Sequence, residues 1–399
     1  MKVLLLENIH PGAARILSDG GIEVRTEKGS LAERDLAAAL KGVSILGLRS
    51  RTQIPRSVFE QADDLLAVGA YCIGTEQIDL PAASLRGVAV FNAPYSNTRS
   101  VAEMTIAEII FLIRRLFDKA VNSHRGIWDK SAEQAREARG KKLGIVGFGN
   151  IGSQVSTLAE AMGMDVYYYD IVDKLSIGNA TRVRTLDELL ATADVITIHV
   201  DGKTSNTNLI GAREFEIMKP GVILLNLSRG HVVDLEALAA AIRGGRVSGA
   251  AVDVFPSEPK NPNERLVSPL QGLPNVLLTP HVAGSTEEAQ ENIAEFVSHK
   301  VLSFARTGNT STSINFPRIN VLRSDDTSSH RLLHVHQNVP GVLSDINGIL
   351  AKNNVNVLAQ YLRTNEQIGY VIADVDKQYK ESLIDDLKQV PHTIRVRLL

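Results

Sequence analysis

Short apolar runs alternate with stretches of helical period over most of the chain. Before residue 99, apolar runs that indicate strands occur at 3–6, 22–25, 44–48, 66–68 and 88–91. Residues 13–18 and 31–40 have the period of helices. After residue 140, further strands are predicted at 143–146, 166–169, 195–199, 223–227, 250–254 and 276–279. This alternation predicts an α/β fold with two doubly wound, parallel-sheet domains.

One of the predicted helices is apolar on more than one side. It runs from residue 101 to about 122, and so broad an apolar surface would be buried between domains or against a second subunit. Trp128 follows in a charged loop, where it either covers a local cluster or anchors a partner subunit. Farther along, Ser285 and Glu288 have the spacing of a capping box, which predicts a helix to about residue 304.

The last part of the chain has a different composition and a different rhythm. Thr, Ser and Asn are frequent between residues 307 and 329, and we interpret 313–329 as a linker. Beyond it the predicted order is β-α-β-β-α-β, over 332–335, 342–353, 355–362, 370–374, 379–388 and 394–398. The domains expected from these patterns are 1–98 with 285–312, then 99–284, and finally 330–399.

The segment 143–170 combines the features of a dinucleotide-binding unit. A buried strand is followed by Gly147, Gly149 and Gly152, then by a helix and a second strand that ends at Asp170. The first glycine permits a sharp turn, the second lets the backbone approach a pyrophosphate, and the third lets the helix pack close to the sheet. The helix N-terminus attracts the same anion. Since Asp170 would bind the adenosine ribose and repel a 2′-phosphate, the sequence predicts a Rossmann-like domain that binds NAD.

Composition narrows the class of protein. The chain has 399 residues, is 44% hydrophobic and carries a net charge of −2. That balance offers nothing to attract nucleic acid or an anionic membrane, and the apolar runs are too short to span a bilayer. Cys72 is the only cysteine, which excludes disulfides within the chain and thiolate zinc sites. We therefore expect a cytoplasmic protein with no metal and with neither a nucleic-acid nor a membrane partner.

Three polar residues follow the ends of predicted strands, where open α/β sheets bind their ligands. They are Arg229, Glu258 and His281. A dehydrogenase for a 2-hydroxy acid needs a cation that holds the substrate carboxylate, and a guanidinium does so with two parallel hydrogen bonds. It needs an acid–base group with a pKa near neutrality, such as histidine, and a carboxylate that orients the imidazole. Arg229, His281 and Glu258 suit these three roles in turn.

The motifs around these residues resemble those of the D-isomer-specific 2-hydroxyacid dehydrogenases. They are the glycine turn with Asp170, Leu-Ser-Arg-Gly at 227–230, Ala-Val-Asp-Val-Phe at 251–255 with Glu258, and Thr-Pro-His-Val-Ala-Gly at 279–284. The resemblance covers roughly residues 1 to 310 and implies that the arginine binds substrate while the Glu–His pair relays a proton. It also implies cofactor contacts from Asn150, Ile151, Leu227, Ser228, Arg229, Asp253, His281, Val282, Ala283 and Gly284.

The same resemblance implies that the first domain is flavodoxin-like and binds the substrate. The substrate contacts it implies come from Arg49, Ser50, Asn97 and Arg229. Arg49 and Arg51 flank Ser50 at the end of a predicted strand, and a phosphorylated substrate would need cations of this kind. They could equally be solvated surface arginines, so both readings stay open.

The third unit resembles an ACT regulatory domain, a fold that binds small amino acids between copies. The resemblance rests on His-Gln-Asn-Val-Pro-Gly-Val-Leu at 336–343 and on Asn356 after the next helix. It implies that His336, Asn338 and Asn356 contact L-serine as an effector. Their amide and imidazole groups can satisfy an ammonium, a carboxylate and a hydroxyl. Taken alone, each asparagine also suits a turn or a cap.

Together, the two resemblances imply NAD-dependent oxidation of 3-phospho-D-glycerate (3-phosphoglycerate) to 3-phosphohydroxypyruvate, the first step of serine biosynthesis. L-Serine would inhibit by feedback, and the substrate would enter between the two α/β domains. One alternative is another 2-hydroxy acid as substrate, such as 2-hydroxyglutarate. A second is a non-enzymatic, NAD-sensing corepressor that binds peptide motifs. The ACT unit and the apolar helix predict a homo-oligomer, and we expect a homotetramer.

Overall fold

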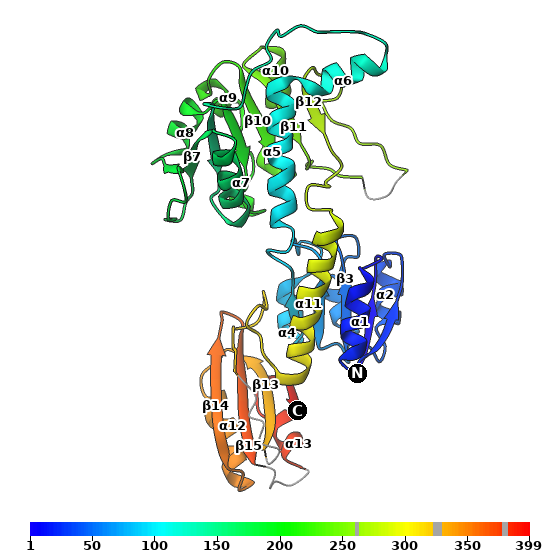
Figure 1. The fold of residues 1–399 in the computed structure, drawn as a ribbon. Coiled ribbons are helices and arrows are strands. Elements are labelled where there is room, and N and C mark those ends of the chain that lie inside the picture. The colour runs from blue at the N-terminus through cyan, green and yellow to red at the C-terminus, as the bar shows by residue number, and fades with distance from the viewer. Residues whose placement is uncertain (260–262, 322–328, 377–381) are drawn as a thin grey trace. The chain divides into compact units, whose positions relative to one another are not determined.

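The computed structural model describes residues 1–259, 263–321, 329–376 and 382–399. Its internal contacts divide the chain into two compact units. Unit 1 consists of Met1–Ser96 with Gln290–Leu399, and unit 2 is Asn97–Ala289. Figure 1 shows two sheets in unit 1 and one in unit 2. The C-terminal segment thus belongs to the same unit as the first α/β domain, and the three predicted domain boundaries stay a prediction.

The first sheet of unit 1 has five parallel strands in the order β2-β1-β3-β4-β5. The strands are β1 (Lys2–Leu5), β2 (Glu23–Thr26), β3 (Ile45–Leu48), β4 (Ala67–Ala70) and β5 (Ala89–Phe91). The helices are α1 (Pro11–Asp19), α2 (Glu33–Ala39), α3 (Arg56–Phe59), α4 (Leu80–Leu85) and α11 (Glu287–Thr307). Because β2 and β3 flank β1, the strand order reverses between β1 and β3, which is the flavodoxin-like pattern.

Both faces of this sheet are buried, as its continuous apolar strands require. Alternate residues of β1 and its extension lie on opposite faces: Val3 and Leu5 belong to one core cluster, and Leu4 and Leu6 to another. Residues of α11 between 293 and 305 belong to the first cluster, so this long helix covers that face. Figure 1 shows α11 beside β3 in unit 1.

Unit 2 contains a parallel sheet of seven strands in the order β12-β11-β10-β9-β6-β7-β8. Its strands are β6 (Lys142–Val146), β7 (Asp165–Tyr169), β8 (Thr181–Arg182), β9 (Val195–Ile198), β10 (Val222–Asn226), β11 (Val247–Val252) and β12 (Val276–Leu278). The α-helices are α5 (Thr98–Arg114), α6 (Leu116–His124), α7 (Asn150–Ala161), α8 (Leu186–Thr192), α9 (Ala212–Ile217) and α10 (Leu235–Arg243), and the 3₁₀ turns are η1 (Thr204–Asn206) and η2 (Gly230–Val232). The strand order reverses between β6 and β9. The predicted pair of doubly wound, parallel sheets is therefore confirmed.

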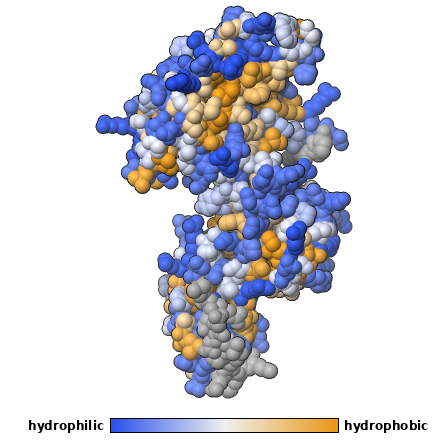
Figure 2. Space-filling view, in the orientation of Figure 1, coloured by the Kyte–Doolittle hydropathy of each residue, from blue (hydrophilic) through white to orange (hydrophobic). Residues whose placement is uncertain are grey.

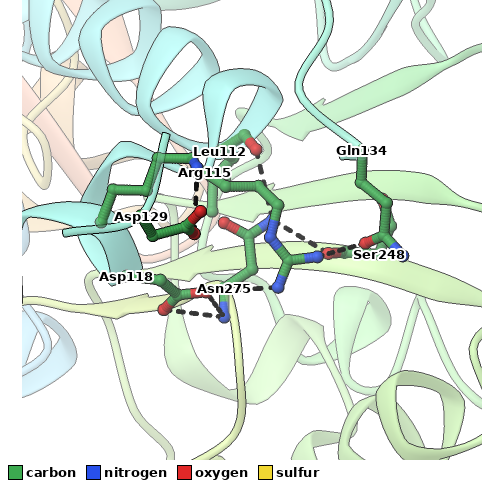
Figure 3. A network of polar contacts seen from close by, with 8 residues as sticks. Leu112, Arg115, Asp118, Asp129, Gln134, Ser248 and Asn275 are labelled. Atoms are coloured by element: carbon green, nitrogen blue, oxygen red, sulfur yellow. Dashed lines mark hydrogen bonds and ion pairs between the residues drawn. The ribbon is translucent and has the colours of Figure 1, made fainter. Parts of the chain in front are cut away.

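The long helix predicted at 101–122 is interrupted at Arg115, so this prediction is wrong. Arg115 has a left-handed conformation, with φ of 52°, between α5 and α6. Figure 3 shows the polar contacts formed around Arg115, where the helix is interrupted. The guanidinium of Arg115 bonds the side chain of Gln134 and lies 3.2 Å from the carboxylate of Asp118, which accepts the backbone N–H of Asn275 at 3.1 Å. These contacts require a turn and outweigh the helical period of the sequence.

Only part of the apolar surface of α5 is buried. Ile109, Leu112 and Ile113 lie in a core cluster with the sheet of unit 2. By contrast, Phe111 is 43% exposed, and Figure 2 shows an apolar area over this helix. In the loop between α6 and β6, Trp128 is 82% exposed. The described part of one chain thus leaves some of this surface uncovered.

The helix after the last strand of unit 2 is capped by Thr286 rather than by Ser285, so the predicted capping box is wrong by one residue. The hydroxyl of Thr286 accepts the N–H of Ala289 at 3.1 Å. The N–H of Ser285 instead donates to the carbonyl of Val282 at 2.8 Å and closes the preceding turn. Among the helices that the structure describes, none has the length and apolarity to cross a membrane.

The second sheet of unit 1 is antiparallel, with the order β14-β15-β13-β16. Its elements are β13 (Ser329–Gln337), α12 (Val342–Lys352), β14 (Val357–Thr364), β15 (Ile368–Asp376), α13 (Leu383–Lys388) and β16 (Thr393–Leu398). The predicted β-α-β-β-α-β order is confirmed, although residues 379–381 of the predicted second helix lie outside the described residues. Leu332 faces the helices of this sheet, whereas Leu333 joins the core shared with the first α/β domain.

The start of the segment interpreted as a linker lies against the first sheet. Ser313 bonds the carbonyl of Val90 at 3.1 Å, and the side chain of Asn315 accepts the N–H of the same valine at 2.8 Å. Both side chains are buried. Residues 322–328 of this segment lie outside the described residues.

Candidate active site

The glycine turn after β6 is shaped by close packing at its first and third positions. Gly147 has φ of 93°, and a Cβ there would lie 2.6 Å from the carbonyl oxygen of His199. At Gly152 a Cβ would lie 2.3 Å from the carbonyl oxygen of Gly147. At Gly149, by contrast, a Cβ would meet nothing within 4 Å. The turn therefore leaves open space at the position where the sequence predicts a pyrophosphate.

The helix after this turn presents unsatisfied N–H groups to that space. α7 begins at Asn150 and has no side-chain cap at Gly149, so the N–H groups of its first turn, including those of Asn150 and Ile151, can bind an anion. Asp170 ends the next strand, and its carboxylate accepts the N–H groups of Phe148 and Val172 at 2.8 Å each. A carboxylate has about four acceptor positions, so ribose hydroxyls can still bind. These residues fit NAD.

The loop that carries His281 is built around a buried carboxylate. Asp253 is 1% exposed and accepts the hydroxyl of Thr279 at 2.7 Å, the N–H of Val282 at 2.9 Å and the N–H of Ala283 at 3.0 Å. The carbonyl of Asp253 accepts the N–H of His281 at 2.8 Å. His281 has φ of 54°, a strained value for a residue with a side chain. Asp253 therefore holds the imidazole in place, and a direct contact with the cofactor stays a prediction.

His281 and Glu258 are hydrogen-bonded to each other. Nδ1 of His281 lies 3.0 and 3.1 Å from the two carboxylate oxygens of Glu258. This bond raises the pKa of His281, although partial burial opposes it. Burial acts to raise the pKa of Glu258, but the bond to His281 and the imidazolium charge outweigh it and lower that pKa. With Nδ1 engaged, Nε2 is the ring nitrogen left to exchange a proton with a ligand.

Arg229 is placed by an asparagine that the sequence analysis missed. Asn226 is fully buried at the end of β10, donates to the carbonyl of Arg229 at 3.0 Å, and accepts from the hydroxyl of Ser228 at 2.7 Å. The charge of Arg229 acts to lower the pKa of both Glu258 and His281. The structure therefore brings the three predicted catalytic residues together within unit 2. The signal in the sequence that could have identified Asn226 is its position as a polar residue at the end of a buried strand.

The remaining residues predicted to bind the cofactor line the same loops of unit 2. Leu227, Ser228 and Ala283 are buried, and Val282 is 39% exposed. At Gly284 a Cβ would lie 2.0 Å from the side-chain nitrogen of Asn97, so Gly284 lets the loop pack against the start of α5. Their contacts with NAD stay predictions.

A second residue that the sequence analysis missed is a buried acid on α5. Glu108 is 6% exposed, and within the described ranges its Oε2 atom has no hydrogen-bond partner. Burial, reinforced by the charge of Asp253, raises the pKa of Glu108 to about 8. The site therefore has a carboxyl that keeps its proton at neutral pH. An acid within an apolar helical stripe was the only sequence signal for it.

The other predicted substrate contacts are divided between the units. Arg49 and Ser50 follow β3 in unit 1, whereas Asn97 and Arg229 belong to unit 2. Arg49 is half-buried and Ser50 is exposed. Their part in substrate binding stays a prediction.

The predicted effector residues lie at two different ends of the antiparallel sheet. His336 pairs with Gly369, and Asn338 bonds the carbonyl of Asn365 at 2.7 Å, close to that end. Asn356 accepts the N–H of Asp376, at the far end of β15. The strand between Gly369 and Asp376 spans roughly 24 Å at about 3.4 Å per residue. A single chain therefore does not bring the three residues together.

His336 has a ring nitrogen suited to accept a hydrogen bond from a ligand. It is 3% exposed, and its Nδ1 atom lies 2.7 Å from the carbonyl of Gln337, which can only accept. Nδ1 therefore carries the proton, and Nε2 is an acceptor. That Nε2 atom is buried without a hydrogen-bond partner in the portion of the chain that the structure describes.

Comparison with known proteins agrees with this geometry. The model of the D-isomer specific 2-hydroxyacid dehydrogenase NAD-binding domain matches residues 106–283. The AHAS small subunit-like ACT domain matches residues 332–395. The chain belongs to the D-isomer specific 2-hydroxyacid dehydrogenases, which are NAD-dependent enzymes, and it carries an ACT domain. The predicted family, enzyme class and cofactor are thus confirmed.

Relatives that match the whole chain are named D-3-phosphoglycerate dehydrogenase. The one from Haemophilus influenzae is 47% identical over 400 residues, which cover 100% of this chain and 97% of the relative. The one from Escherichia coli is 46% identical over 402 residues, with the same coverage. Among solved structures, the D-lactate dehydrogenase from Aquifex aeolicus complexed with NAD and lactic acid is 27% identical. It superposes with a TM-score of 0.68 and covers 79% of this chain and 99% of its own.

Proposed function

We propose that the chain catalyses the NAD-dependent oxidation of 3-phosphoglycerate to 3-phosphohydroxypyruvate, the first step of serine biosynthesis. The observation that carries the proposal is the grouping of Arg229, Glu258 and His281 in the unit that also holds the glycine turn and Asp170. The substrate is supported by the names of the two relatives, each of which this chain matches over nearly the full length.

The residues of unit 2 suit each part of this reaction. Bound NAD⁺ supplies the hydride acceptor, held by the N–H groups after Gly149 and by Asp170. Arg229 binds the substrate carboxylate with its planar guanidinium and polarises the reacting carbon–oxygen bond. Neutral His281 accepts the hydroxyl proton at Nε2. Glu258 then stabilises the imidazolium through its bond to Nδ1.

A turnover assay tests this proposal. NADH formation is measured with 3-phosphoglycerate and, in parallel, with 2-hydroxyglutarate. We expect the phosphorylated acid to be preferred. His281→Ala should lower kcat by about 10²- to 10⁴-fold, the usual worth of a general base, whereas His299→Ala, at an exposed histidine of α11, should not. Near-normal turnover by His281→Ala, or preference for 2-hydroxyglutarate, would contradict the proposal. Peptide binding without any turnover would favour the corepressor alternative.

We propose further that L-serine inhibits the enzyme from a site shared by two ACT domains. β14 is an edge strand, and it exposes Leu358 and Tyr361 by 52% and 43%. If two copies pair antiparallel along β14, Asn356 of one chain approaches the His336 end of the other. The free acceptor on His336 suits the ammonium or hydroxyl of an amino acid. This arrangement accounts for the separation of the predicted residues in one chain.

Mixing two variants tests the shared site. His336→Ala and Asn356→Ala should each abolish inhibition by serine when prepared alone, while Gln389→Ala, at an exposed residue of the same domain, should retain it. Co-expression of the first two variants should restore part of the inhibition, because a mixed pair has one intact site. No recovery in verified mixed pairs would contradict a site built from two chains.

We propose a homotetramer located in the cytoplasm. Two surfaces support assembly: the apolar area over α5 and the exposed edge of β14. Two separate self-association surfaces can link four chains. Sedimentation of the full chain measures the assembly directly, and a monomer at micromolar concentration would contradict it.

A further inference from the structure

A polar network at the carboxyl end of the first sheet holds the turn that carries Arg49 and Ser50. It lies between β1 and β3, where the strand order reverses and where open α/β sheets bind their ligands. Glu7 follows β1, and the turn 49–52 follows β3. Glu7 is 8% exposed and has a left-handed φ of 59°. A buried carboxylate on strained backbone points to a specific task.

The carboxylate of Glu7 binds two successive backbone N–H groups. One oxygen accepts from Thr52 at 2.7 Å, and the other accepts from Arg51 at 3.0 Å. Glu7 is itself held in place, because its own N–H donates to the carbonyl of Gly29 at 3.0 Å. Hydrogen bonds from N–H groups to a carboxylate are stronger than those between neutral groups. Glu7 therefore fixes the second half of the turn.

The first half of the turn is fixed by a buried amide. Gln77 is 7% exposed and donates from its side chain to the carbonyl of Arg49 at 2.6 Å. The carbonyl of Gln77 accepts the N–H of Ile54 at 2.8 Å, which ties this residue to the chain beyond the turn. Ser50 thus lies between two peptide groups that are held by two different segments of the chain.

The turn presents cations that are not neutralised by the protein. In the described ranges, neither Arg49 nor Arg51 forms an ion pair with a carboxylate. Glu7 is the acid bonded to this turn, but its two oxygens are engaged by the backbone N–H groups of Arg51 and Thr52. A surface arginine pair needs no buried scaffold, whereas a ligand-binding pair gains affinity when its backbone is held in advance.

We propose that Glu7 is a positioning residue that, together with Gln77, preorganises the Arg49–Arg51 turn to bind a multiply charged anionic group. The inference rests on the proposed function, in which that group is the phosphate of 3-phosphoglycerate. Glu7 acts through the backbone of the arginines and does not touch the substrate. Its loss should therefore weaken substrate binding without altering the NAD site.

The first test is Glu7→Gln, which keeps the length of the side chain but places an amide N–H₂ against a backbone N–H. We expect KM for 3-phosphoglycerate to rise roughly tenfold, equivalent to about 1.4 kcal/mol, while KM for NAD changes less than about twofold. Glu60→Gln makes the same substitution at an exposed residue of the same domain that pairs with Arg56, and it should leave both values unchanged.

A double-mutant cycle separates positioning from general stability. In a chain with Arg49→Gln and Arg51→Gln, adding Glu7→Gln should raise KM no further, because the groups through which it acts are gone. An equal rise in both backgrounds would overturn the proposal. If Glu7→Gln fails to fold by circular dichroism, Glu7→Asp, which keeps the charge but withdraws it from the turn, is run through the same cycle.

Failure of the proposed function has a different signature. It appears as absence of turnover of 3-phosphoglycerate by the unaltered chain. In that case the cycle is repeated on the binding of inorganic phosphate, measured by calorimetry with NADH present to fill the cofactor site. Loss of phosphate binding in Glu7→Gln, without further loss in the arginine-free background, supports the role of Glu7. Phosphate binding that Glu7→Gln leaves unchanged overturns it.

Discussion

Removal of the charge on Glu258 should move the pH dependence of the reaction toward acid. In the structure, both carboxylate oxygens lie within 3.1 Å of Nδ1 of His281, and this contact raises the pKa of the imidazole. In the proposed mechanism oxidation requires neutral His281, so activity should be lost as pH falls through that pKa. In Glu258→Gln the pKa falls, and the acid limb of kcat/KM should shift to lower pH. The reverse reduction requires protonated His281, and its loss at high pH should begin earlier.

Glu258→Gln should also lower kcat. The loss should be small, because His281 and Glu258 are both partly exposed to solvent. A hydrogen bond to a charged group contributes about 1.5–3 kcal/mol. The side chains of His281 and Glu258 are 50% and 37% exposed, so solvent screens the pair and the lower end applies. About 1.5 kcal/mol corresponds to roughly a tenfold loss of rate. That is well below the loss expected when the imidazole itself is removed.

The assay is initial NADH formation over a range of pH, in both directions of the reaction. Glu216→Gln, at an exposed acid of the same unit, provides the matched control and should keep the profile of the unaltered chain. Circular dichroism establishes that each variant is folded. An acid limb that stays in place in Glu258→Gln would refute the reasoning, because it would show that the carboxylate does not set the protonation of His281.

Three further predictions concern the cofactor turn and the ACT domain. Gly152→Ala should lose NAD affinity and about 1–3 kcal/mol of stability, since the new Cβ would lie 2.3 Å from the carbonyl of Gly147; KM for NAD and thermal melting measure this. Asp170→Asn should raise the ratio of kcat/KM for NADP to that for NAD by roughly tenfold. Arg331→Met should cost about 3–5 kcal/mol in urea unfolding, because the fully buried guanidinium bonds both oxygens of Asp374 at 2.7 and 2.8 Å.

Each of these has an outcome that would contradict it. Normal NAD affinity in Gly152→Ala would mean that the turn can relax. An unchanged cofactor ratio in Asp170→Asn would remove this residue from ribose recognition. For the buried pair, Arg331→Met combined with Asp374→Leu should recover part of the lost stability, since it leaves no buried charge behind. If the double variant is less stable than the single one, burial of an unpaired carboxylate is not the cause.

The period of apolar residues predicted most of the fold because it reports burial directly. Strands buried on both faces read as short apolar runs, and β10, buried at every position, is such a case. The period failed at Arg115, where the apolar pattern continues but the helix stops. The cause is a set of contacts with Asp118 and Gln134 and the neighbouring strand, and these depend on the tertiary arrangement. A local pattern does not contain that information.

The chemical residues of the site were easier to predict than the residues that hold them. Arg229 and His281 stand out because their side chains suit a reaction and follow apparent strands. Asn226, Glu108 and Glu7 have no such pattern. Asn226 bonds the carbonyl of Arg229 three residues later, whereas the partners of Glu108 and Glu7 are far away in sequence. Recognition of these residues requires their hydrogen bonds and burial, which only the folded chain shows.

The residues predicted to bind the effector show a stricter limit of sequence reasoning. A motif can assign His336 and Asn356 to one site, but the register of the sheet places them at its two ends, next to Gly369 and Asp376. The two statements are compatible only if the site draws its residues from two chains, and the exposed edge of β14 is where a second chain can pair. The separation within one chain is therefore an argument for assembly, and recovery of inhibition in mixed pairs would connect the motif to the fold.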